Sequence, residues 1–175
     1  HGTANSLDTI VEAARLLDQS HPGKFLILLV GDGPEKPQLI EQAVDIECLK
    51  FKPPIPKQEI PVLLRAADGL ILTLKDFPLF RYSVSPNKLY DSYAAGKPVL
   101  VAVGGALNRE VQEYRLGFSA EPEDAKGLAT AMLELLETPP DEREAMGRRG
   151  QALVYSTYSR GKVAKELWHL IQQDL

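Results

Sequence analysis

The chain has little of several features that define common classes of protein. Its single cysteine, Cys48, excludes a disulfide within the chain and indicates a reducing compartment. Its three histidines lack the spacing of metal ligands, so we predict no metal site. No apolar run is long enough to cross a bilayer and no signal peptide is visible, which predicts a soluble protein in the cytoplasm.

Positive charge is also scarce. The formal net charge is −4, whereas a protein that binds nucleic acid through its phosphate backbone is usually basic overall. Nucleic acid is therefore not an expected partner. This charge is still compatible with a local basic site for one diphosphate group.

The apolar residues that are present form a regular pattern. The 175 residues are 44% hydrophobic, which suffices for one domain with a sizeable core. Helical patterns follow Ser6, a predicted N-cap, and the Gly33-Pro34 pair, and the chain beyond residue 119 is predicted to be helical. Apolar runs bounded by turn residues predict strands at 25–30, 49–52, 69–74, 98–102 and 117–119.

Strands that alternate with helices predict an α/β fold. We expect a Rossmann-like, doubly wound parallel sheet with helices on both faces. Ligands of such sheets bind beyond the carboxyl ends of the strands, so the loops at those ends should line one crevice. Residues 1–158 are assigned to this domain, and residues 159–175 to a C-terminal helix.

The most informative segment is SVSPNKLYDSYAAGKPVLV, residues 83–101. Ser85 and the proline after it are helix-start signals, and such a start presents free backbone N–H groups that bind phosphate. Ser85, Asn87 and Lys88 are the predicted diphosphate partners. Asp91, more than a turn later, can accept hydrogen bonds from a hydroxylated ligand. An ordinary capped helix with solvated side chains is the alternative interpretation.

The stretch LYDSYAAGKPVLVAVGG resembles the signature of the C-terminal, donor-binding domain of GT-B glycosyltransferases of family 4. The similarity continues, in order along the chain, through LDTIVEAARLL, FLILLVGDGPEKPQL, IPVLLRAADGLILTL and DAKGLATAMLELL. The SPNK variant is similar to bacterial members that build surface polysaccharides. The resemblance implies one half of a GT-B fold and a nucleoside diphosphate sugar, of UDP or GDP type, as donor substrate, with no cofactor.

The family has two glutamates eight positions apart, and both are replaced here. Ser83 stands at the first position, which in the family acts at the donor sugar, and Asp91 stands at the second, which binds the ribose. Serine has no charge, so the family's catalytic detail does not carry over unchanged to Ser83. Asp76 or Arg81 is the candidate substitute.

Other binding residues follow from the same resemblance. Asn5 takes the place of the family's phosphate-binding lysine, and Lys88 is the candidate for the missing cation. Phe51 and Lys52 correspond to the loop that holds the nucleobase, although a simple turn is the alternative there. The pair Gly104 and Gly105 allows either a close approach of backbone to ligand or merely a turn.

The resemblance implies the nucleotide-sugar-binding half of a retaining glycosyltransferase of hexosyltransferase type. Its acceptor, a carbohydrate or a lipid-linked sugar, would bind an N-terminal domain toward which helix 159–175 packs. The full enzyme would work in the cytoplasm or peripherally at the inner face of the membrane, and this piece alone would be inactive.

Two alternatives remain open from the sequence. The first is a nucleotide-binding or scaffolding module that has lost catalysis, which the departures at Ser83 and Asn5 motivate. The second is a GT-B nucleotide-sugar epimerase. Such an enzyme needs a histidine in the cleft, and none of the three histidines in the sequence is a candidate for that position. The family's first strand, central to its sheet, also has no counterpart here, so residues 1–5 are expected to be the end of the loop after it.

Overall fold

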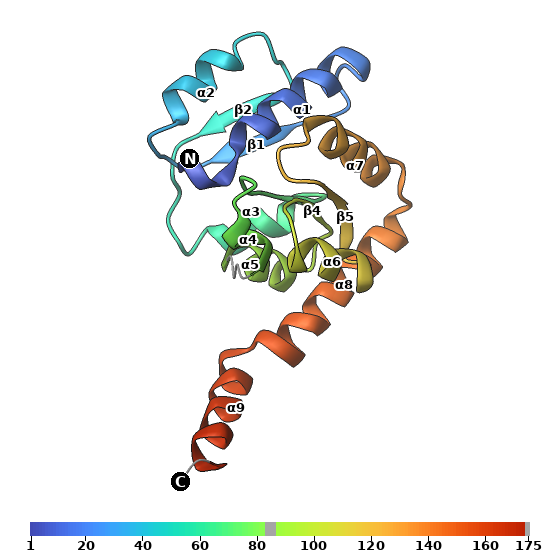
Figure 1. The fold of residues 1–175 in the computed structure, drawn as a ribbon. Helices are drawn as coiled ribbons and strands as arrows, with labels where there is room; N and C mark the ends of the chain where they lie inside the picture. The colour runs from blue at the N-terminus through green and yellow to red at the C-terminus, as the bar shows by residue number, and fades with distance from the viewer. Residues whose placement is uncertain (83–86, 174–175) are drawn as a thin grey trace.

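The computed structural model of the protein describes residues 1–82 and 87–173, in which strands alternate with helices (Figure 1). The strands are β1 (Ile27–Val30), β2 (Leu49–Lys52), β3 (Leu70–Thr73), β4 (Val99–Ala102) and β5 (Gly117–Ala120). The helices are η1 (Thr3–Asn5), α1 (Leu7–Ser20), α2 (Lys36–Gln42), α3 (Ile60–Ala66), α4 (Pro78–Tyr82), α5 (Asn87–Ala95), α6 (Ala106–Glu113), α7 (Ala125–Glu137), α8 (Pro140–Leu153), η2 (Val154–Tyr158) and α9 (Arg160–Gln173). Of these, η1 is a 3₁₀-helix and η2 a π-helix.

The strands form two parallel sheets. Strand β1 pairs with β2, and β3, β4 and β5 pair in that order. The predicted α/β class with parallel strands is confirmed, and between β1 and β3 the ladder is interrupted. The described strands therefore form a two-stranded and a three-stranded sheet, where a single sheet was expected.

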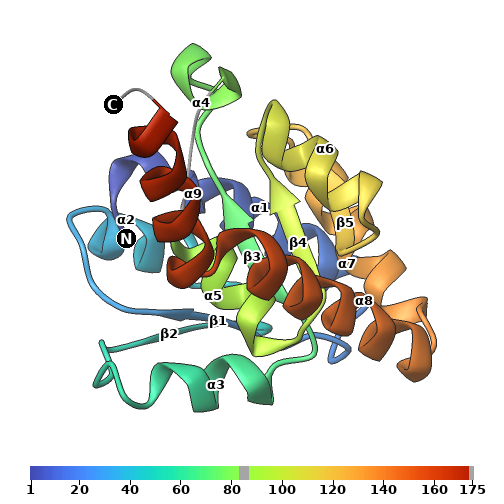
Figure 2. The ribbon, with the colours of Figure 1, turned by 90° about the horizontal axis from the view of Figure 1, so that it is seen from below.

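Side chains rather than strand pairing hold the two sheets together. One core cluster combines residues of β1 and β2 with residues of β4, and α1 and α7 contribute to it. Within β4, Leu100 and Ala102 belong to this cluster, while Val99 and Val101 belong to a second cluster with α5 and α6. Because side chains alternate across a strand and all four residues of β4 are buried, both faces of β4 are covered. Figure 2 shows helices on both sides of this strand.

Some local details differ from what the sequence indicated. The segments after β3 and β4 contain the helices α4 and α6, which the sequence did not predict. Helix α4 is too short for an apolar period to reveal it, and α6 buries mainly Leu107, Asn108 and Val111. Ser6 precedes α1 but makes no side-chain capping bond, because its hydroxyl lies 2.9 Å from Thr9 Oγ1 instead.

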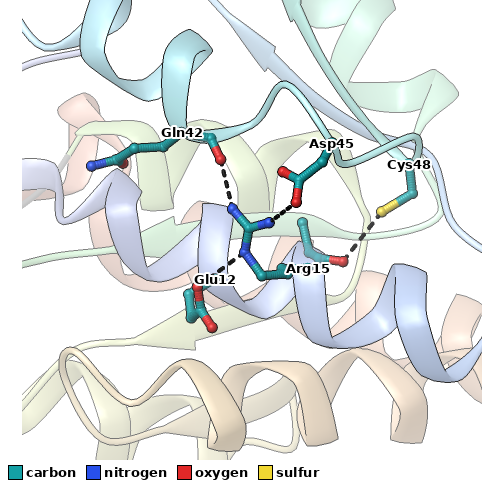
Figure 3. A network of polar contacts seen from close by, with 6 residues as sticks. Glu12, Arg15, Gln42, Asp45 and Cys48 are labelled. Atoms are coloured by element: carbon teal, nitrogen blue, oxygen red, sulfur yellow. Dashed lines mark hydrogen bonds and ion pairs between the residues drawn. The ribbon is translucent and has the colours of Figure 1, made fainter.

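Helix α1 is fastened to the connection between α2 and β2 by a polar network (Figure 3). The Arg15 guanidinium donates to Asp45 Oδ2 at 2.5 Å and to the Gln42 carbonyl at 2.6 Å. Hydrogen bonding from Arg15 lowers the pKa of Asp45. Asp18 accepts from the backbone N–H of Cys48 at 3.1 Å, and the Cys48 thiol lies 3.5 Å from the Ala14 carbonyl.

We expect Cys48 to resist alkylation in the folded protein. Its side chain is buried, and burial, reinforced by the Asp18 carboxylate, raises the pKa of the thiol to about 11. The thiolate is the reactive form, so iodoacetamide at neutral pH should label the native protein very slowly and the urea-unfolded protein quickly. Mass spectrometry of timed samples measures both rates. Equal rates in the two states would contradict the buried position.

The C-terminal helix α9 extends away from the strands, at the far end of the molecule from the N-terminus (Figure 1). Its Leu167, Trp168 and Leu170 side chains are largely exposed. Within residues 1–82 and 87–173, no helix combines the length and the apolar character needed to cross a membrane.

Candidate functional site

The N-terminal segment joins the carboxyl ends of the two sheets. The His1 carbonyl accepts from Glu35 N at 3.3 Å, beyond the end of β1. The Ala4 carbonyl accepts from Lys75 N at 3.1 Å, beyond the end of β3. The hydroxyl of Thr73, the last residue of β3, donates to the Asn5 carbonyl. This segment therefore brings Asn5 to the strand ends where parallel sheets bind ligands.

Asn5 meets Lys88 at this place. Lys88 Nζ donates to Asn5 Oδ1 at 3.2 Å, although the two residues are 83 positions apart in the chain. Lys88 lies in the first turn of α5, and its side chain is exposed. Across the described residues, no carboxylate forms an ion pair with Lys88, so its charge is available to an anionic ligand. The two side chains are thus in contact, and the role of Lys88 as the cation for a diphosphate stays a prediction.

Helix α5 also carries Asp91. Leu89 and Tyr93 are fully buried and anchor the helix to the second core cluster. Asn87 and Asp91 are exposed, and Asp91 follows Lys88 by three positions, which puts the ammonium and the carboxylate on neighbouring parts of the helix surface. A cation and a hydrogen-bond acceptor are therefore presented side by side.

The space beside Gly104 and Gly105 is occupied by helix α4. Gly105 has φ of 74°, and a Cβ there would come within 2.0 Å of the Arg81 carbonyl oxygen. A Cβ on Gly104 would lie 3.1 Å from Arg81 Cγ. The close backbone approach that the glycine pair allows is thus made by α4. A role for either glycine toward a ligand stays a prediction.

Arg81 binds Asp76, the carboxylate that was considered as a substitute for the glutamate missing at Ser83. Its Nε donates to Asp76 Oδ1 at 2.6 Å and its Nη2 to Asp76 Oδ2 at 2.5 Å. This bidentate pairing lowers the pKa of Asp76. Asp76 N in turn donates to Glu123 Oε2 at 3.2 Å. The Asp76 carboxylate is therefore ionised and already engaged.

The loop after β2 is held in place by a lysine that the sequence did not single out. Lys36 Nζ donates to the Gly31 carbonyl at 2.7 Å and to the Lys52 carbonyl at 3.1 Å. Phe51 is half-buried, and its ring centroid lies 5.9 Å from that of His1. Nothing in the local sequence marks Lys36, because its acceptors are backbone carbonyls five and sixteen positions away.

The position of His1 corrects one expectation from the sequence. No histidine was expected at the crevice, yet the His1 ring lies against Phe51 at the carboxyl end of β2. Both ring nitrogens are buried and have no hydrogen-bond partner within the described residues.

Two predicted residues cannot be placed in the site. Ser83 and Ser85 lie outside the described residues. Over the described ranges, no cluster of three or more histidine, cysteine, aspartate or glutamate side chains has the arrangement of a metal site.

A hollow of about 460 Å³ lies beside the first turns of α1 rather than at Lys88. Asp8, Glu12 and Glu123 are among the residues that line it, with Arg15 as a basic one. Like charges repel, so this excess of carboxylates makes the hollow unfavourable for a diphosphate. The Asn5–Lys88 contact is the better candidate for that group.

Comparison with known proteins adds an independent line of information. The model of a family described as "Glycosyl transferases group 1" matches residues 2–138. A D-inositol 3-phosphate glycosyltransferase of Salinispora tropica is 30% identical over 171 residues, which cover 91% of this chain and 34% of the relative. The chain spans about a third of the length of the curated relatives it matches.

Solved structures share the fold. Anabaena HepE, solved in complex with UDP and glucose, superposes with a TM-score of 0.76 at 20% identity, over 97% of this chain and 45% of that one. The C-terminal domain of a group 1 glycosyl transferase, LpcC of Francisella tularensis, gives a TM-score of 0.69 at 21% identity, over 91% of this chain and 84% of that one.

Proposed function

Because this chain belongs to the family of group 1 glycosyl transferases, we propose that it is the donor-binding domain of a retaining GT-B enzyme of family 4, of the type that builds bacterial surface polysaccharides. The donor is a nucleoside diphosphate sugar, and the acceptor is a carbohydrate or a lipid-linked sugar. The observation that carries the proposal is the contact between Lys88 and Asn5 at the carboxyl ends of the strands.

The described side chains supply distinct parts of donor binding. Lys88 attracts the diphosphate by charge-assisted hydrogen bonds, with Asn5 as a neutral donor beside it. Asp91 accepts hydrogen bonds from the ribose hydroxyls. The backbone of Phe51 and Lys52 holds the edge of the base, and Ser85, Asn87, Gly104 and Gly105 complete the proposed donor site.

The chemistry proposed for this half of the enzyme is stabilisation of a leaving group. When the bond between the sugar and the diphosphate breaks, negative charge grows on the departing phosphate oxygen. A fixed ammonium such as Lys88 lowers the energy of that state more than that of the intact donor, so it accelerates transfer. The nucleoside diphosphate leaves with the electron pair, and the acceptor hydroxyl forms the new bond with retention at the anomeric carbon.

The domain assignment remains part of the proposal. Residues 1–158 form the nucleotide-sugar-binding unit, and the C-terminal segment 159–175 packs toward an acceptor-binding domain through the exposed apolar side chains of α9. We further propose that the 175-residue chain binds nucleotide weakly and transfers no sugar alone, and that the complete enzyme works in the cytoplasm, peripherally at the inner face of the membrane.

Replacing Lys88 by methionine should weaken nucleoside diphosphate binding about 10- to 100-fold, since a hydrogen bond to a charged group contributes roughly 1.5–3 kcal/mol. Asp91→Ala should weaken binding of UDP but leave binding of inorganic pyrophosphate unchanged. Calorimetric titration with UDP, GDP and ADP measures each affinity. The Lys88→Met variant should also lose much of the salt dependence of binding, because it removes a charge from the site.

Lys126→Met is the matched control. Lys126 is an exposed lysine on α7, a helix whose buried residues belong to the first core cluster rather than to the proposed donor site. Failure of all three nucleotides to bind the folded wild-type protein would count against a donor site. An equal loss in the Lys126 and Lys88 variants would show that the effect is one of net charge only.

A binding module without catalysis is the second candidate. It is favoured by the neutral Asn5 at the family's lysine position and by the engagement of Asp76 with Arg81. Assays of the complete protein on a panel of nucleotide sugars distinguish the two, with Asp91→Ala as the binding-deficient control. Sugar transfer supports the enzyme, and nucleotide binding without transfer supports the module. Epimerisation of the donor would instead identify the epimerase.

A further inference from the structure

Lys36 links the ends of two neighbouring strands. Its Nζ donates to the carbonyl of Gly31, the residue after β1, and to that of Lys52, the last residue of β2. The Gly31 N–H donates to the same Lys52 carbonyl at 3.2 Å. One ammonium therefore connects both loops at the point where the β1–β2 ladder ends.

The contact has a clear physical effect on the backbone. The Gly31 carbonyl accepts from Lys36, and the Lys52 carbonyl accepts from Lys36 as a second donor beside the Gly31 N–H. A hydrogen bond from a charged donor is stronger than one from a neutral donor, so it restrains both carbonyls. Lys36 is half-buried and belongs to the first turn of α2, so its backbone is fixed by the helix. The carbonyl of Lys52, directly after Phe51, is thereby held in one orientation relative to Gly31.

We propose that Lys36 is a positioning residue that sets the base selectivity of the donor site. It acts by fixing the Phe51–Lys52 backbone as the surface against which a nucleobase is read; this rests on the proposed donor-binding function. Bases differ in the donors and acceptors along their edges, so a backbone held in one orientation favours one base over the others. A loosened backbone adapts to several bases and binds each of them less well.

The role assigned to Lys36 concerns the base and leaves the phosphates to Lys88. Lys36 bonds the strand ends of β1 and β2, whereas Lys88 bonds Asn5, whose own carbonyl contacts the end of β3. Lys36 therefore lies at the end of the β1–β2 sheet, and Lys88 lies near the end of β3 in the other sheet. A change at Lys36 should alter discrimination between nucleotides that carry the same diphosphate.

The test compares Lys36→Met with Lys50→Met by titration of UDP, GDP, ADP and inorganic pyrophosphate. Lys50 is an exposed residue in the middle of β2 and serves as the control for loss of one positive charge. Lys36→Met should weaken the preferred nucleotide about 10-fold and reduce the differences among the three nucleotides, while pyrophosphate affinity changes less than twofold. Lys36→Arg, which retains charged donors, should recover part of the selectivity.

Amide hydrogen exchange provides a measurement that needs no ligand. The Gly31 N–H, bonded to Lys52 O, should exchange faster in Lys36→Met and at the wild-type rate in Lys50→Met. Unchanged selectivity, or an equal loss for all nucleotides and pyrophosphate, would overturn the role of Lys36. Absence of any nucleotide binding to the wild-type protein would instead refute the donor site itself. Unchanged exchange at Gly31 in Lys36→Met would then also refute the proposed restraint of the Gly31 and Lys52 backbone by Lys36.

Discussion

Gly147→Ala is expected to lower the free energy of unfolding by about 2–3 kcal/mol, because overpacking a close backbone contact outweighs the better helix propensity of alanine. Gly147 lies in α8, and a Cβ there would come within 2.0 Å of the Gly96 carbonyl oxygen and 2.5 Å of its carbon. Both atoms are backbone, so no side-chain rotation relieves the clash. Helix α8 would have to move away from the end of α5.

Thermal and urea unfolding measure this effect. For a chain of this size, each kcal/mol corresponds to a shift in Tm of about 2–4 °C. Gly161→Ala is the matched control, since Gly161 is also in a helix but a Cβ there meets nothing within 4 Å. That variant should be neutral or gain up to about 1 kcal/mol from helix propensity. A similar change in both variants would contradict the close packing of α8 on α5.

Glu110→Ala should lower the free energy of unfolding by about 3 kcal/mol. The substitution leaves two tyrosine hydroxyls without their acceptor, and each such loss costs roughly 1–3 kcal/mol. The Tyr93 hydroxyl donates to Glu110 Oε1 at 2.9 Å, and the Tyr158 hydroxyl donates to Glu110 Oε2. The carboxylate thus joins α5, α6 and η2. Tyr158 also contacts the Tyr90 ring, with centroids 4.6 Å apart.

The pH dependence of this cluster has a definite sign. Burial, together with the Glu110 carboxylate, raises the pKa of Tyr93 and of Tyr158 above the ordinary value for tyrosine. Both hydroxyls therefore stay protonated in the folded state at a pH where unfolded tyrosine ionises. The unfolded state then binds fewer protons, so the free energy of unfolding should fall as the pH rises above about 10.

The control for Glu110→Ala is Glu113→Ala, since Glu113 is exposed on the same helix.

A second pair of variants compares Tyr158→Phe with Tyr155→Phe, because Tyr155 belongs to η2 as well but is 65% exposed. Trp168, the only tryptophan, lies on α9 and reports the motion of that helix by fluorescence anisotropy. Anisotropy should fall in Tyr158→Phe and remain unchanged in Tyr155→Phe. Identical values would show that Tyr158 does not restrain α9.

The strands were predictable because their signals are local. The run FLILLV contains β1, and β2 was predicted with its observed bounds, Leu49–Lys52. Gly96, predicted to stop its helix, follows the last residue of α5 and has φ of 72°. Each signal depends on neighbouring residues and their own backbone preferences. The interruption between β1 and β3 could not be seen in this way, since strand pairing depends on which strands meet in space.

The sequence could propose site residues only where a residue type itself carries the chemistry. Lys88 was proposed as the cation for the Asn5 position; the two side chains are in contact, and the role itself stays a prediction. Lys36 was missed because its partners are backbone carbonyls, which every residue possesses and which therefore leave no mark in the sequence. Arg81 was considered as a substitute at the donor sugar, which stays a prediction; the position of its backbone beside Gly105 could not be read from the sequence.

The sequence by itself determined the α/β class, most strand and helix positions and the membership in the group 1 glycosyl transferases, because periodicity, turn residues and motif order are properties of neighbouring residues. Only the tertiary structure decided that Lys36 ties two strand ends, that α4 covers Gly105 and that Glu110 serves two tyrosines. These contacts join residues distant in the chain, and their partners become defined only when the helices pack on the strands.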